Sequence, residues 1–211
     1  MTEDYQFTNS WFDLTAKPIW DQLIPKVRPK RILEIGSYEG ASACYLIHTL
    51  APQQDIELYC VDSWAGGVEH QAGEAAAADM EAVEQRFHHN TQLAIQNAHY
   101  TVTLVPRKGF SDVCLNQLLH EGKRGYFDFI YVDGSHQAPD VLCDAVLGFK
   151  LLKVGGYMVF DDYLWNENLP YGKDPIRSPK IAVDAFVNVN IRKLNILQTP
   201  LYQFYIQKIA E

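Results

Sequence analysis

The chain alternates short β-rich runs with longer segments of helical periodicity, and this alternation restricts its fold more than any other feature. Strands and helices that follow one another in turn favour a parallel sheet covered by helices on both faces. The sequence therefore predicts a doubly wound α/β fold. The expected strands are 31–35, 56–62, 101–106, 127–133 and 156–162, and the expected helices between them are 40–51, 80–98, 111–122 and 139–152.

The two ends of the chain complete this pattern. Residues 1–30 are expected to form a helical extension, with one helix or a helix pair from Trp11 to Val27. After Pro179 the pattern predicts a helix and then two strands, which are joined by a short turn that contains a proline. A connection of about two residues requires antiparallel pairing, so the sheet should have seven strands with one of them reversed near the C-terminus. These last elements are expected at 180–190, 193–199 and 201–209.

Size and loop composition bear on the domain organisation. With 211 residues, of which 47% are hydrophobic, the chain can bury one sizeable core, so a single domain over residues 1–211 is expected. Two long segments, 63–80 and 164–179, mix aromatic, glycine and polar residues in the way that lids and specificity loops do.

Charge and cysteine content exclude several classes of protein. A formal net charge of −8 argues against a broad surface for binding nucleic acid. The chain has no apolar run that approaches 18 residues, and its four cysteines form no CxxC pair. We therefore expect no membrane segment and a reducing compartment, hence a cytoplasmic location. The sequence leaves a homo-oligomer open.

Acidic residues stand at the ends of the expected strands. Open parallel sheets bind ligands at the carboxyl ends of their strands, near the point where the strand order reverses. Carboxylates gathered there repel one another unless a cation lies among them, and hard divalent cations prefer oxygen ligands. The alternative is that two of these acids cap helices and bond to the loop. The acids in question are Glu34, Asp62, Asp133, Asp161 and Asp162.

The turn after the first strand reads EIGSYEGAS. Its glycines permit a sharp turn and a close approach of the backbone to a ligand. It is neither GxGxxG nor followed by GK[ST], which gives little support to dinucleotide or triphosphate binding. The Glu34 carboxylate suits a cationic amine instead, and Asp62 suits the ribose hydroxyls of an adenosine-containing cofactor. The simpler alternatives are an ordinary strand–helix turn and a loop acid.

With these motifs the chain resembles class I S-adenosylmethionine-dependent methyltransferases. Within that class it is similar to the metal-dependent small-molecule O-methyltransferases of the catechol and caffeoyl-CoA type and to the bacterial branch that modifies sugars and secondary metabolites. The resemblance rests on EIGSYEG, YCVD, KGFSDV, FDFIYVDGSH and LLKVGGYMVFDDY. It implies a Rossmann-like fold, S-adenosylmethionine as cofactor and a divalent cation, usually Mg²⁺.

The resemblance also assigns roles to residues. The turn that holds the methionine part of the cofactor matches Glu34, Gly36, Ser37 and Gly40. Asp62 matches the acid that binds the ribose, and Phe110 and Ser111 match the segment beside the adenine. The metal ligands match Asp133, Asp161 and Asp162, of which Asp133 also borders the cofactor, although catechol-type enzymes often have Asn at the last position. His136 stands where a catalytic lysine is common.

These residues together predict an S-adenosylmethionine-dependent, divalent-metal-assisted O-methyltransferase that acts on a small hydroxylated molecule: a sugar, a catechol-like compound or a secondary metabolite. His136 is the expected general base, since an imidazole is largely neutral at pH 7; the alternative is a loop residue. The rival functions are a methyltransferase that uses no metal or methylates nitrogen, and a catalytically silent cofactor-binding protein. Expected acceptor contacts, which could equally anchor their loops, are Trp64, His70, Tyr163, Trp165 and Tyr171.

Overall fold

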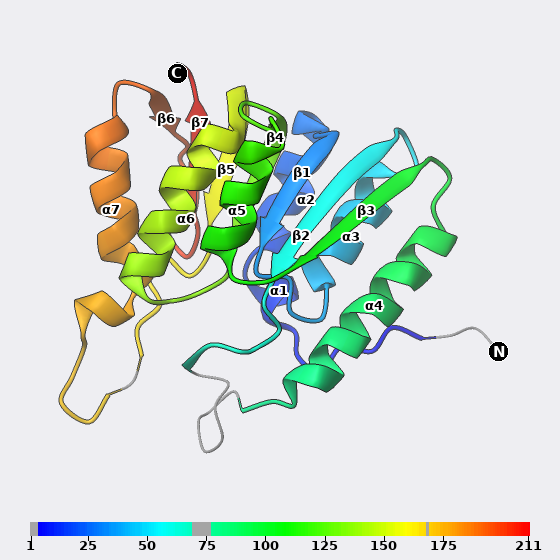
Figure 1. Cartoon of the computed structure of the whole chain (residues 1–211), viewed down its shortest axis with the longest axis horizontal. Helices are drawn as coiled ribbons and strands as arrows, with labels where there is room; N and C mark the ends of the chain where they lie inside the picture. Colours follow the sequence, from blue (N-terminus) through cyan, green and yellow to red (C-terminus); the bar gives the residue numbers. More distant parts are fainter. Residues whose placement is uncertain (1–3, 69–76, 168) are drawn as a thin grey trace.

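A seven-stranded sheet lies between two layers of helices in the computed structural model, which describes residues 4–68, 77–167 and 169–211 (Figure 1). The strand order is β3-β2-β1-β4-β5-β7-β6. Strands β1 to β5 pair in parallel, and within the described residues only β7 runs opposite to the other strands, so that it pairs antiparallel with both β5 and β6. The predicted fold class and the single reversed strand are confirmed. The strands are β1 Arg31–Ile35, β2 Ile56–Asp62, β3 Val102–Lys108, β4 Phe127–Val132, β5 Leu152–Phe160, β6 Leu194–Ile196 and β7 Phe204–Lys208.

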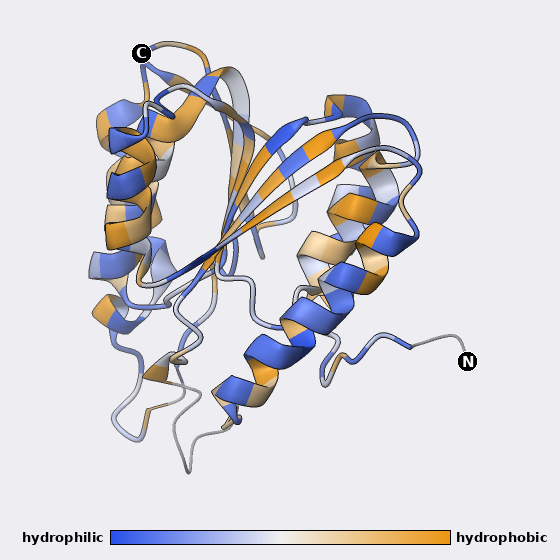
Figure 2. Cartoon of the chain, turned by 45° about the vertical axis from the view of Figure 1, so that its right-hand side comes forward, coloured by the Kyte–Doolittle hydropathy of each residue, from blue (hydrophilic) through white to orange (hydrophobic). Residues whose placement is uncertain are grey.

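Helices cover both faces of the sheet and form two separate hydrophobic cores with it. One core contains the buried faces of α2 to α4, and the other contains those of α5 to α7. The helix faces that point away from the sheet are more polar, and Figure 2 shows this for α4, whose outer face is largely hydrophilic. The helices are α1 Trp11–Leu14, α2 Lys17–Val27, α3 Ala41–Leu50, α4 Met80–Gln96, α5 Ser111–His120, α6 Ala138–Leu151 and α7 Pro179–Asn190, with a 3₁₀ turn, η2, at Pro175–Arg177.

Several predicted strand boundaries are wrong, and two of these differences change the sheet most. Strand β5 begins at Leu152 and not at 156, because a register shift in its pairing with β4 allows the strand to start opposite Phe127. The connection between β6 and β7 covers 197–203 and is therefore longer than a tight hairpin turn. On its other edge β7 pairs with β5, and the start of β7 lies at the carboxyl end of β5, where Phe204 pairs with Phe160.

The strand order reverses between β1 and β4, which are neighbours at the centre of the sheet. In open α/β sheets ligands bind at such a reversal, beside the carboxyl ends of the strands. The chain leaves the sheet at this same edge after β2 and after β5, which end shortly before the segments expected to act as lids begin, at 63 and 164. No helix within the described ranges has the length and apolar character that a bilayer crossing requires.

Candidate functional site

Three aspartates meet where β4 and β5 end. Asp133 directly follows β4, and Asp161 and Asp162 directly follow β5. Because these strands are parallel neighbours, with Val132 beside Phe160, the residues after them share one edge of the sheet. One carboxylate oxygen from each aspartate lies within 4.8 Å of the other two. The structure thus gathers the three acids into one cluster, as a common site requires.

Asp161 is fixed by side chains that the sequence did not reveal as part of a site. The residue is 8% exposed, the Tyr131 hydroxyl donates to its Oδ2 and the Gln203 amide donates to its Oδ1 at 2.7 Å. Tyr205 donates in turn to the Gln203 carbonyl oxygen, which fixes the amide group as the donor toward Asp161. Gln203 immediately precedes β7. Because β7 runs opposite to β5, the residue before β7 lies at the edge where β5 ends, and this reversed direction is the one feature of the sequence that indicates the position of Gln203.

Asp162 lies at the more open side of the cluster. Its backbone φ is 53°, a left-handed conformation that aspartate and asparagine adopt more readily than most residues. Its Oδ2 is 2.9 Å from Nε2 of His136. The His136 ring stacks on Trp165, with ring centroids 4.2 Å apart. His136 therefore lies beside the acid cluster, where the predicted base is required.

The electrostatics of the cluster favour a bound cation. Burial, and then the charges of Asp161, Asp162 and Glu34, raise the pKa of Asp133 well above its ordinary value. Burial and the Asp162 charge raise the pKa of Asp161 as well. Three carboxylates in this environment do not all ionise easily near neutral pH without a positive charge among them. Their oxygen atoms and close spacing fit a hard divalent cation, and the donors to Asp161 orient it as outer hydrogen bonds orient metal ligands.

The turn after β1 lies next to this cluster. A Cβ atom at Gly36, whose φ is 85°, would lie 2.0 Å from the backbone oxygen of Asp133, so only glycine permits this approach of the two strand ends. Glu34 is fully buried and accepts hydrogen bonds from the hydroxyls of Ser37, at 2.6 Å, and Ser42. These two hydrogen bonds mean that the buried Glu34 carboxylate stabilises the turn.

Asp62 ends β2 and faces the same turn. Its Oδ2 accepts the backbone N–H groups of Ser37 and Tyr38 at 2.8 and 2.9 Å, and its Oδ1 accepts that of Trp64 at 2.7 Å. The carboxylate therefore joins the ends of β1 and β2 at the edge of the sheet. Its expected contact with a ribose stays a prediction.

The predicted adenine segment begins α5. Phe110 precedes the helix and is 67% exposed, and Ser111 is the first residue of the helix, near Asp144 of α6. Asp144 is 1% exposed, and its Oδ1 has no hydrogen-bond partner among the described residues. Burial raises the pKa of Asp144 from 3.8 to about 7, while the nearby Ser111 side chain acts in the opposite direction. The pattern of the sequence offered no signal for this buried acid.

Asp144 is expected to make stability depend on pH. Its folded pKa is raised, so the protein loses stability as pH rises from about 4, the ordinary pKa of the carboxyl group, through about 7. Asp144→Asn should remove this loss. The variant should then gain up to about 4 kcal/mol over the wild type at pH 8, from roughly three pKa units, and little at pH 4. Thermal unfolding of the wild type and the variant at pH 4 and pH 8 measures this gain, and Asp13→Asn, at an exposed aspartate, is the control. A stability difference between variant and wild type that is the same at both pH values would contradict the prediction.

The residues expected to contact the acceptor differ in how deeply they are buried and in what they pack against. Trp64 is 5% exposed and packs on Phe87, and Tyr163 is 7% exposed and donates to Asp184 at 2.6 Å, so these two anchor their loops. Trp165 lies against His136, whereas Tyr171 is 73% exposed. His70 lies outside the described residues.

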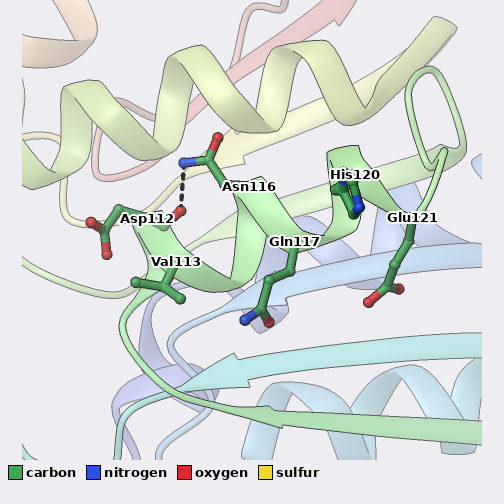
Figure 3. A pocket seen from close by; sticks show the side chains of 6 residues that line it. All are labelled: Asp112, Val113, Asn116, Gln117, His120 and Glu121. Atoms are coloured by element: carbon green, nitrogen blue, oxygen red, sulfur yellow. Dashed lines mark hydrogen bonds between the residues drawn. The ribbon is translucent and has the colours of Figure 1, made fainter.

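A shallow hollow lies apart from the acid cluster on the outer surface of α5 (Figure 3). Its lining consists of the helix itself and the residue that caps it, and it includes none of the predicted site residues. We assign it no function, because one helix surface provides no converging polar groups. The lining residues are Asp112, Val113, Asn116, Gln117, His120 and Glu121.

Comparison with known proteins finds relatives of this chain. Residues 33–163 match a family described as "Methyltransferase domain". Caffeoyl-CoA O-methyltransferase 1 of Eucalyptus globulus is 35% identical over 184 residues, which are 78% of this chain and 63% of that protein. The chain thus spans somewhat less than two thirds of the length of this relative.

Solved structures share the fold at lower identity. An O-methyltransferase from Bacillus cereus in complex with SAH superposes with a TM-score of 0.63 at 17% identity, covering 98% of this chain and 84% of that one. The MycE methyltransferase of the mycinamycin biosynthetic pathway, in complex with Mg, SAH and mycinamycin VI, gives a TM-score of 0.57 at 17% identity, covering 98% of this chain and 51% of that one.

Proposed function

The chain belongs to the methyltransferase-domain family, and from this premise we propose that it transfers a methyl group from S-adenosylmethionine to a hydroxyl oxygen of a small molecule, assisted by a divalent cation. The observation that supports the cation most strongly is the cluster of three carboxylate oxygens within 4.8 Å beside the Gly36 turn. The name of the Eucalyptus relative supports transfer to an oxygen atom, and the Mg in the MycE complex supports the cation.

The cofactor is assigned to the edge of the sheet between β1, β2 and β4. In the proposed arrangement the turn at residues 36–40 receives the methionine part, Asp62 the ribose, and Phe110 and Ser111 the adenine. S-adenosylmethionine supplies a methyl group on a positively charged sulfur, which is displaced in line by an oxygen nucleophile. The protein's task is therefore to hold that oxygen close to the methyl group and aligned with it.

The acceptor is assigned to the neighbouring acid cluster. Asp133, Asp161 and Asp162 would hold the divalent cation, which would supply positive charge that lowers the pKa of an acceptor hydroxyl. His136, 2.9 Å from Asp162, takes up the hydroxyl proton. Tyr131 and Gln203 keep Asp161 oriented, and the Trp165 ring restricts the imidazole of His136. The acceptor itself is proposed only as a small hydroxylated molecule, because loops rather than the fold select it.

Cofactor binding and dependence on the cation test the proposal. Calorimetry should show binding of S-adenosylmethionine and of SAH but not of NAD. Transfer to a diol acceptor should stop in excess EDTA and return when Mg²⁺ or Mn²⁺ is restored. Full transfer in EDTA would favour a metal-independent enzyme, SAH binding without transfer to any acceptor would favour a silent binding protein, and NAD binding alone would contradict the proposal altogether.

A further inference from the structure

Glu39 is a buried acid in the proposed cofactor turn, and the proposed chemistry gives it no task. It is 2% exposed and lies between Tyr38 and Gly40. A buried carboxylate is costly unless it is paired or hydrogen-bonded. Arg86 of α4 lies 2.6 Å from its Oε1. Thr8 provides the other partners: its backbone N–H donates to Oε2 and its hydroxyl donates to Oε1, both at 2.7 Å.

Asn90 of α4 joins the same N-terminal segment to the turn. Its side chain is fully buried and all three of its contacts are to backbone. The Oδ1 atom accepts the N–H of Gln6 at 2.7 Å, and the Nδ2 atom donates to the carbonyl oxygens of Gln6 at 3.1 Å and Glu39 at 2.9 Å. Residues 6–8 are therefore fixed to the turn by two buried side chains, although they lie about 30 residues before it in the chain.

The turn has little freedom to move on its other sides. A Cβ atom at Gly40, whose φ is 80°, would lie 3.0 Å from the Phe87 ring and 3.2 Å from the Thr91 methyl group. The backbone N–H groups of Ser37 and Tyr38 are bonded to Asp62. Figure 1 shows the N-terminal segment passing α4 on its way to α1. The turn is thus enclosed by α4, by the end of β2 and by the N-terminal segment.

We infer that residues 6–8 position the cofactor turn, so that their attachment to Glu39 and Asn90 raises the affinity for the cofactor. This inference rests on the proposed function, because it concerns the turn that receives the methionine part. Of the three boundaries of the turn, the segment is the only one outside the sheet and its covering helices. When it detaches, the Glu39 carboxylate loses two donors, and the turn is free to leave the form that binds the cofactor. The cofactor and the segment should stabilise each other reciprocally.

A matched pair of substitutions at Thr8 tests this inference. Proline supplies neither the N–H nor the hydroxyl, so Thr8→Pro should weaken SAH binding, measured by calorimetry, by about tenfold. Thr8→Ser keeps both donors and should bind SAH within about twofold of the wild type. Tyr5→Phe is the control within the same segment, because the Tyr5 hydroxyl bonds to His48 of α3 at 2.7 Å and does not reach the turn.

Hydrogen exchange tests the reciprocal effect on the wild-type protein. SAH should slow exchange of the backbone amides of Gln6 and Thr8, whose acceptors are Asn90 and Glu39. Unchanged exchange in the SAH complex, or a Thr8→Pro variant that binds SAH as the wild type does, would overturn the inference and leave the proposed function intact. A wild type that binds no SAH would overturn the proposed function instead.

Discussion

Replacing Asp133 with alanine is expected to lower cation-dependent kcat by about 10²–10³-fold, since a ligand to the proposed cation contributes to several kcal/mol of charge stabilisation. The fold should survive, because Asp161 keeps its donors Tyr131 and Gln203. Because the pKa of Asp133 is raised in the folded protein, ionising this residue lowers the free energy of unfolding. The loss begins above about pH 4, the ordinary pKa of the carboxyl group, and grows until pH exceeds the folded pKa. Without a cation, Asp133→Ala should therefore unfold at a temperature no lower than the wild type at pH 8.

The matched comparison is Asp162→Asn. Asparagine keeps an oxygen ligand and tolerates the left-handed backbone at φ 53°, so this variant should retain much more activity than Asp133→Ala. Binding of Mn²⁺ to both variants, followed by electron paramagnetic resonance, separates loss of the cation from loss of chemistry. If Asp133→Ala bound Mn²⁺ and turned over like the wild type, the carboxylates would require a structural explanation.

Replacing His136 with alanine is expected to lower kcat by about 10²–10⁴-fold, which is the usual cost of losing a general base. SAH affinity should remain nearly unchanged, because the proposed cofactor residues lie on the turn after β1, at the end of β2 and at the start of α5. The measurement is kcat on a confirmed acceptor from pH 6 to 9, together with calorimetry of SAH. His120→Ala supplies the control, because His120 is an exposed histidine at the end of α5.

The position of His136 allows one other outcome. Its Nε2 atom contacts Asp162, so the imidazole could act by orienting that carboxylate. In that case His136→Ala would lower the affinity for Mn²⁺, and saturating Mn²⁺ would restore kcat. Wild-type kcat at every pH without added Mn²⁺ would show that His136 takes no part in either role.

Much of the fold follows from local patterns. The runs RILEI and IELYCVD match β1 and β2 residue for residue, because buried parallel strands need continuous apolar sequence and their ends are marked by turns. Strand β5 shows where this reasoning fails: its first residues pair with β4 across a register shift, and no pattern within the strand encodes a shift between two strands. The short turn expected between β6 and β7 is wrong as well, because β6 and β7 are shorter than their apolar runs and residues 197–203 connect them.

The sequence by itself determined which acids stand at strand ends, and parallel order then brings those ends to one edge. Asp133, Asp161 and Asp162 could therefore be grouped before the structure was known, although their role as cation ligands stays a prediction. Only the tertiary structure decided what surrounds them. Gln203 reaches Asp161 across 42 positions, and Thr8 reaches Glu39 across 31. Periodicity and strand ends are properties of neighbouring residues in the chain, whereas a hydrogen bond between distant side chains depends on which elements pack together.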